Sequence, residues 1–108
     1  MSKNNMRPIH PGEILREEYL VPLGMTPNAL SIQLRVPAPR INEVVRERRG
    51  ISTDTALRLA RFFNTTPQFW LNLQSAYDIS LAEQAAGEEI ASLPTRPTDE
   101  RPRQPSLI

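Results

Sequence analysis

Residues 26–51 hold two short apolar segments separated by proline, and this arrangement restricts the fold more than any other feature. The first segment opens with Thr26 and Pro27, a hydroxyl cap followed by a proline that suits the first helical position. Two leucines four positions apart then share one helical face. The helix is expected to end at Val36, because the following Pro37 disfavours the α conformation in the residue before it.

A second short helix is predicted to begin near Pro37. Pro39 fits its first turn, where backbone N–H groups have no intrahelical partner. Two short helices at this spacing indicate a helix-turn-helix, whose second helix enters the DNA major groove. The apolar stripe of this helix comprises Ile41, Val44 and Val45, and its other face carries Arg40, Asn42, Glu43, Arg46 and Glu47.

A plain helical hairpin is the alternative interpretation of residues 26–51, but the side chains favour DNA binding. Arg40 and Asn42 are the residue types that read guanine and adenine edges, and we predict that they contact bases. Arginines suit phosphate, so phosphate contacts are predicted for the cluster at the end of the helix. That cluster consists of Arg46, Arg48 and Arg49.

The turn between the two helices has a small–turn–apolar pattern that allows close crossing. Ser31, Arg35 and Ile41 occupy its three positions. Arg35 stands where glycine is frequent, and the tight turn conformation costs a residue with a side chain about 1 kcal/mol. The sequence therefore predicts a left-handed arginine at the turn.

The composition restricts the class of protein. The chain has 108 residues and no cysteine, which indicates one small domain, excludes disulfides and thiolate zinc sites, and fits a cytoplasmic location. No apolar run is long enough to span a membrane, and the N-terminus lacks the apolar region of a secretory signal. His10 is the lone histidine. It is predicted to pack near a helix start, and neither metal nor cofactor is expected.

Charge is distributed unevenly along the chain despite a net charge of +1. Residues 35–63 carry seven arginines and three acids, a net +4, whereas residues 64–100 carry one arginine and six acids, a net −5. A basic middle beside an acidic segment indicates one surface for a polyanion and another for a different partner.

The remaining segments complete a predicted five-helix, all-α domain over residues 11–86. We expect a flexible arm over residues 1–10, and a proline-rich, disordered tail over residues 87–108. A first helix over 12–23 should be broken near Pro22 and stopped by Gly24. Its buried side is expected to comprise Ile14, Leu15, Tyr19, Leu20 and Leu23.

Residues 52–54 (Ser-Thr-Asp) are predicted to start the fourth helix. The hydroxyls of Ser52 and Thr53 could bind a DNA phosphate at this helix end, and simple capping is the alternative.

The fifth helix is predicted from Thr66-Pro67 to about Ala86, and it carries more apolar groups than one stripe can hold. An exposed second apolar face on a small protein indicates a partner. We predict dimerisation through this helix or the surface beside it, with another protein partner as the alternative. A single core is the competing explanation for Phe69, Trp70 and Leu73. The candidate dimer residues are Trp70, Tyr77, Ile79 and Leu81.

Over roughly residues 7–86 the chain resembles the HigA-type antitoxins, a branch of the Xre/Cro–C1-like helix-turn-helix proteins. The resemblance is carried by IHPGEILREEYL, TPNAL, RINEVVRERRGI, STDTALRLARFF and, most specifically, TPQFWLNLQSAYD. It implies a lambda-repressor-like, five-helix domain that dimerises on operator DNA, represses its own operon and neutralises a HigB-type, RelE-like mRNA-cleaving toxin. The recognition positions correspond to Pro39, Arg40, Asn42 and Arg46. Glu47 stands where the family often has glycine, and it is expected to lengthen the third helix by a turn.

Three alternative functions are weighed against this hypothesis. A stand-alone Xre-type repressor would have the same fold but no toxin partner. A protein-interaction module would use the basic patch for an acidic protein, although the arginine and asparagine face argues against it. An enzyme such as a nuclease is disfavoured, because no acid–base pair or metal constellation is evident.

Overall fold

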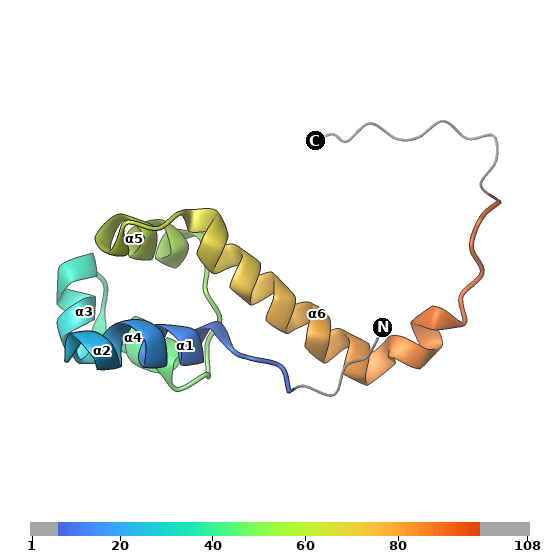
Figure 1. The fold of residues 1–108 in the computed structure, drawn as a ribbon, viewed down its shortest axis with the longest axis horizontal. Helices are drawn as coiled ribbons and strands as arrows, with labels where there is room; N and C mark the ends of the chain where they lie inside the picture. The colour runs from blue at the N-terminus through green and yellow to red at the C-terminus, as the bar shows by residue number, and fades with distance from the viewer. Residues whose placement is uncertain (1–6, 98–108) are drawn as a thin grey trace.

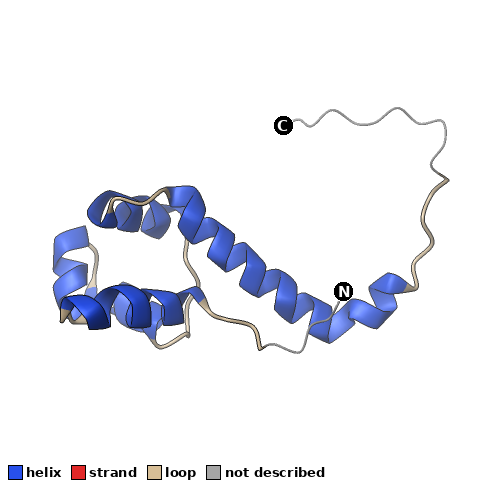
Figure 2. Ribbon diagram, in the orientation of Figure 1, coloured by secondary structure: helices blue, strands red, loops and turns tan. Residues whose placement is uncertain are grey.

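The computed structural model describes residues 7–97, and every regular element in that range is a helix (Figure 2). Three consecutive elements form one continuous helical segment, residues 11–23, which we call the first helix. The predicted five-helix, all-α architecture is therefore confirmed for the described chain (Figure 1). The elements are α1 (Pro11–Ile14), the π-helical η1 (Leu15–Leu20), α2 (Val21–Leu23), α3 (Pro27–Leu34), α4 (Ala38–Val45), α5 (Thr53–Phe63) and α6 (Pro67–Ala91).

The first helix accommodates Pro22 by widening. The N–H of Val21 donates to the carbonyl oxygen of Arg16, five residues earlier, so the turn before the proline is π-helical. This helix continues through Pro22 and stops at Gly24, as predicted, where the backbone is left-handed with φ 63°. The expectation that Leu23 would be buried is wrong, because it is 61% exposed at the last turn, after the wider turn has shifted the helical register.

The helix-turn-helix forms as predicted from its local signals. The hydroxyl of Thr26 accepts a 3.0 Å hydrogen bond from the N–H of Ala29, and Pro27 takes the first position of α3. Arg35 adopts a left-handed conformation with φ 60°, and α4 follows with Pro37 at its N-cap. The two helices pack through fully buried apolar side chains that include Leu30 and Ile41.

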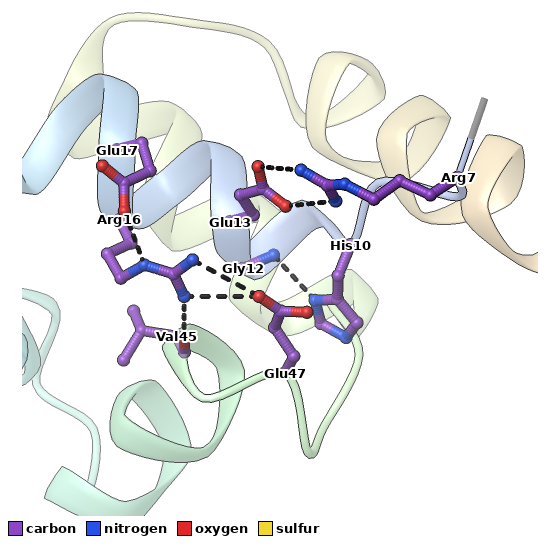
Figure 3. A network of polar contacts seen from close by, with 8 residues as sticks. All are labelled: Arg7, His10, Gly12, Glu13, Arg16, Glu17, Val45 and Glu47. Carbon is purple, nitrogen blue, oxygen red and sulfur yellow. Dashed lines mark hydrogen bonds and ion pairs between the residues drawn. The ribbon is translucent and has the colours of Figure 1, made fainter.

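The predicted lengthening of α4 by a turn is wrong. The helix ends at Val45, and Glu47 adopts the left-handed conformation usually given to glycine, with φ 63°. Arg16 of the first helix donates to the carbonyl oxygen of Val45 at 2.5 Å and lies 3.4 Å from the Glu47 carboxylate (Figure 3). These contacts satisfy a carbonyl at the helix end and offset the cost of the turn, about 1 kcal/mol.

The aromatic side chains close the core between the first helix, α5 and α6. Trp70 is 0% exposed and its indole N–H donates to the Thr65 hydroxyl at 2.8 Å. Its ring lies 5.1 Å from that of Tyr19 and 5.0 Å from that of Phe69, measured between centroids. The prediction of Trp70 as a dimer residue is therefore wrong, because core packing leaves it no surface for a partner.

Helix α6 extends farther than predicted and runs away from the other helices (Figure 1). The backbone is non-helical at Ala86, with φ −139°, but the helix resumes and continues to Ala91. The boundary placed after residue 86 is therefore too early, because Gly87 lowers helix stability by only about 1 kcal/mol and good helix formers follow it. Most of the tail, residues 98–108, lies outside the described residues.

The end of the N-terminal arm packs on the domain, contrary to the expectation of flexibility up to residue 10. The guanidinium of Arg7 makes two hydrogen bonds, of 2.8 and 2.9 Å, with the Glu13 carboxylate. His10 is buried and caps α1. Residues 1–6 of the arm lie outside the described residues.

Candidate nucleic-acid interface

Arg40 projects from α4 toward the start of α5. Its guanidinium forms an ion pair with the carboxylate of Asp54, which also accepts a 2.8 Å hydrogen bond from Nε of Arg58. Hydrogen bonds from Arg58 and then Arg40 hold the pKa of Asp54 below its usual value, so this carboxyl stays charged. Arg40 is thereby held in one orientation, and a contact with a base would require exchange or extension of this ion pair.

Arg58 supports the recognition helix in a way that we did not predict. Besides its pair with Asp54, it donates to the carbonyl oxygen of Leu34 at 2.8 Å and so caps the end of α3. The four-residue spacing of Asp54 and Arg58 is visible in the sequence as a helical ion pair. The contact with Leu34 depends on the tertiary fold, and no local signal announces it.

Asn42 lies on α4 opposite the start of α3. Its side-chain NH₂ donates to Oδ1 of Asn28 and to the carbonyl oxygen of Ala38, each at 2.9 Å. In this rotamer both donors are used, and the amide oxygen is left to accept from a base. The predicted paired contact with adenine also needs one N–H, so the bond to Asn28 would have to open. Asn28 is a second residue that we did not predict.

The segment after α4, residues 46–50, forms what we call the arginine loop. Arg46, Arg48 and Arg49 are all exposed, and within residues 7–97 none of the three forms an ion pair. Their charges are therefore available to solvent or to a polyanion. This differs from Arg40, whose charge is already partnered.

The other three candidate residues lie at helix starts. Pro39 is exposed in the first turn of α4 and offers an apolar surface, suited to a thymine methyl group. Ser52 caps α5 by accepting a 3.2 Å hydrogen bond from the N–H of Thr55, so its structural role is capping. Thr53 is exposed at the first position of α5. The proposed phosphate contacts of Ser52 and Thr53 stay a prediction.

His10 has the packing role predicted for it. Its Nδ1 accepts a 2.8 Å hydrogen bond from the N–H of Gly12, and its ring meets the edge of Tyr77 at 4.8 Å between centroids. Burial is the main cause that lowers its pKa below 6.5, against the opposing charges of Glu47 and Asp78. Among the described residues, no group of three possible metal ligands is brought together, and no helix is long and apolar enough to cross a membrane.

We expect the protein to lose stability as the pH falls through about 6.5 because of His10. Its pKa is lower in the folded state, so the unfolded state binds the additional proton. The stabilisation is complete above about pH 6.5 and falls as the pH decreases toward the lowered value. Urea unfolding of the protein and of His10→Asn, which keeps a capping acceptor without titrating, measures the effect. If the free energy of unfolding depends on pH equally in the two proteins, His10 is not the group responsible.

Comparison with known proteins places the chain in a family, although no protein-family model matches it. Virulence-associated protein I of Dichelobacter nodosus is 61% identical over 82 residues, which cover 76% of each chain. Antitoxin HigA-1 of Vibrio cholerae is 36% identical over 80 residues, covering 73% of this chain and 74% of that protein. The solved structure of Pseudomonas aeruginosa antitoxin HigA with the higBA promoter has a TM-score of 0.79 at 52% identity, covering 82% of this chain and 97% of that chain. The chain belongs to the HigA-type antitoxins, a non-enzymatic family of Xre-like helix-turn-helix proteins.

Proposed function

We propose that this protein represses its own operon by binding operator DNA in the major groove. The observation that carries the proposal is the placement of Arg40 and Asn42 on α4, directly before an arginine loop whose three arginines form no ion pair within residues 7–97. A groove-facing helix with cations at its end supplies both base contacts and phosphate contacts. The Pseudomonas aeruginosa relative, solved with promoter DNA, supports this use of the fold. Such a function places the protein in the cytoplasm, with the DNA.

The proposal includes neutralisation of a HigB-type toxin that is RelE-like and cleaves mRNA. Membership of the HigA-type antitoxins supports it, as does the name of the Vibrio cholerae relative. A toxin-sized reading frame beside the gene would allow a direct test: its co-expression with this protein should restore growth, and the two proteins should co-purify. A gene with no such neighbour would instead favour a stand-alone repressor.

We further propose that the protein acts as a dimer through the outer part of α6. Ile79 and Leu81 are 55% and 41% exposed there, and Tyr77 is half-buried against His10. Burying these apolar groups in a second copy would stabilise the dimer, and a dimer places two α4 helices about 34–36 Å apart, in successive major grooves. Light scattering should give twice the chain mass of 12.3 kDa, whereas a single chain mass would contradict this.

Two arginine substitutions should separate base contacts from phosphate contacts. Arg40→Ala is expected to cost about 1–3 kcal/mol of binding and to relax preference at one base pair. Arg49→Ala should weaken binding to all sequences alike and lower the salt slope by about one. Titrations against the operator and its single-base variants measure both. Unchanged affinity and base preference in Arg40→Ala would mean that α4 does not face the bases in the way proposed.

A further inference from the structure

The arginine loop is joined to α6 by one side chain. Gln74, 23 residues away from Ile51 in the chain, accepts a 2.6 Å hydrogen bond from the N–H of Ile51 through Oε1. Its Nε2 donates to Oδ1 of Asp78 at 3.0 Å, which fixes the orientation of the amide. Ile51 itself is buried in the core. Ile51, the residue that follows the arginine loop, is therefore held both by its buried side chain and by its backbone N–H.

Gly50 gives a second indication of this contact. A Cβ at Gly50 would lie 2.7 Å from Oε1 of Gln74 and 2.9 Å from both Cδ and Nε2. The φ of Gly50 is not in the left-handed region, which among the glycines of the described chain is adopted by Gly24. A side chain at this position would therefore have to displace the Gln74 amide, although it would meet no backbone strain. The loop and the amide of Gln74 are fitted closely to one another.

The other end of the arginine loop is also held from outside the helix-turn-helix. Arg16 of the first helix binds the carbonyl oxygen of Val45 and the Glu47 carboxylate, as Figure 3 shows. The loop is therefore fixed before Arg46 by the first helix and after Arg49 by α6. Long arginine side chains on a fixed backbone lose less conformational entropy on binding than those on a mobile one.

We propose that Gln74 is a positioning residue for DNA binding, which holds the arginine loop so that its cations meet phosphates. This inference rests on the proposed operator binding and extends it to a residue on α6, the helix proposed for dimerisation. Without Gln74, the N–H of Ile51 has no partner and the end of the loop is released. Base contacts from α4 do not depend on this bond, so sequence preference should be retained.

The test compares Gln74→Ala, Gly50→Ala and the double variant with the full chain. Binding to a labelled duplex from upstream of the operon, and to a scrambled duplex, is titrated across a salt series. Each single variant should bind about tenfold more weakly, with a salt slope lower by about one for each phosphate that the loop no longer neutralises. The ratio of affinities for the two duplexes should stay unchanged.

The double variant distinguishes a shared contact from two separate effects. Gly50→Ala acts by displacing the Gln74 amide, so once that amide is absent the added methyl group should weaken binding little further. Gln68→Ala is the matched control, because Gln68 also lies on α6. Within residues 7–97, its side chain forms a hydrogen bond only with Asn72 of the same helix. It should bind like the wild type. Thermal unfolding of each variant sets a temperature at which all are folded, and Gly50→Ala carries the test if Gln74→Ala does not fold.

Several results would overturn the inference. Unchanged affinity and salt slope in both single variants would show that the loop needs no support from Gln74. Two further results would show that the weaker binding does not come from a released loop. One is effects of the two substitutions that add in the double variant, and the other is a loss of preference for the operator duplex in the variants. If the wild type binds no duplex, the proposed function fails together with the inference. If the wild type binds the operator and the variants bind it equally well, only the inference about Gln74 fails, and the proposed function stands.

Discussion

Replacing Trp70 with alanine is expected to lower the free energy of unfolding by about 3–5 kcal/mol, the usual cost of removing a buried aromatic side chain. Trp70 is fully buried, and its ring lies among those of Tyr19, Phe63 and Phe69. The substitution removes the contacts of the indole with these three rings and leaves the Thr65 hydroxyl without its indole partner. A decrease of this size is a large part of the stability of a small domain.

Urea unfolding followed by circular dichroism measures this decrease. Ile79→Ala is the control, because Ile79 is 55% exposed on the same helix and should cost less than about 1 kcal/mol per chain outside a dimer. Unfolding at low protein concentration limits the contribution of association. A Trp70→Ala variant that keeps its stability but no longer dimerises would contradict the structure and place Trp70 at an interface.

Gly12→Ala should be the second most disruptive substitution. A Cβ at Gly12 would lie 1.8 Å from the carbonyl oxygen of Val44 and 2.8 Å from its carbonyl carbon, distances that no side-chain rotation can relieve. The first helix and α4 must then move apart. We expect the free energy of unfolding to fall by about 3 kcal/mol, at the upper end of typical overpacking. Because Val44 belongs to α4, operator affinity should fall as well.

Gly87→Ala is the matched control for Gly12→Ala. Apart from its neighbours in the same helix, no atom of residues 7–97 lies within 4 Å of a Cβ added at Gly87, which is within α6. Alanine there should leave stability unchanged or raise it by up to about 1 kcal/mol, from helix propensity. Comparable thermal stability of the Gly12 and Gly87 variants would show that the first helix and α4 are not in the close contact described.

Local signals account for most of the fold that could be predicted from the sequence. Capping hydroxyls at Thr26, Ser52 and Thr66 each accept the expected backbone N–H, because a cap depends on residues only three positions apart. The left-handed conformation of Arg35 followed from the short turn between two helices. The helix starts and the helix-turn-helix were therefore accessible without tertiary information.

Several of the errors share a different cause, because they depend on residues far apart in the chain. Glu47 ends α4 where Arg16 supports the left-handed turn. The apolar pattern of α6 predicts a partner surface that includes Trp70, because the pattern does not indicate which face of α6 meets the first helix and α5. The roles of Arg58 and Gln74 in the candidate site depend on contacts with Leu34 and Ile51. No spacing along the chain indicates these pairs.

The central claim, sequence-specific binding to operator DNA, is tested most directly by titrating the purified protein against DNA from upstream of its own operon. A scrambled duplex of equal length is the control, and both are measured across a salt series. The account predicts tight binding with a strong preference for the upstream DNA and a steep fall in affinity as salt increases. Equal, weak binding to both duplexes would contradict it.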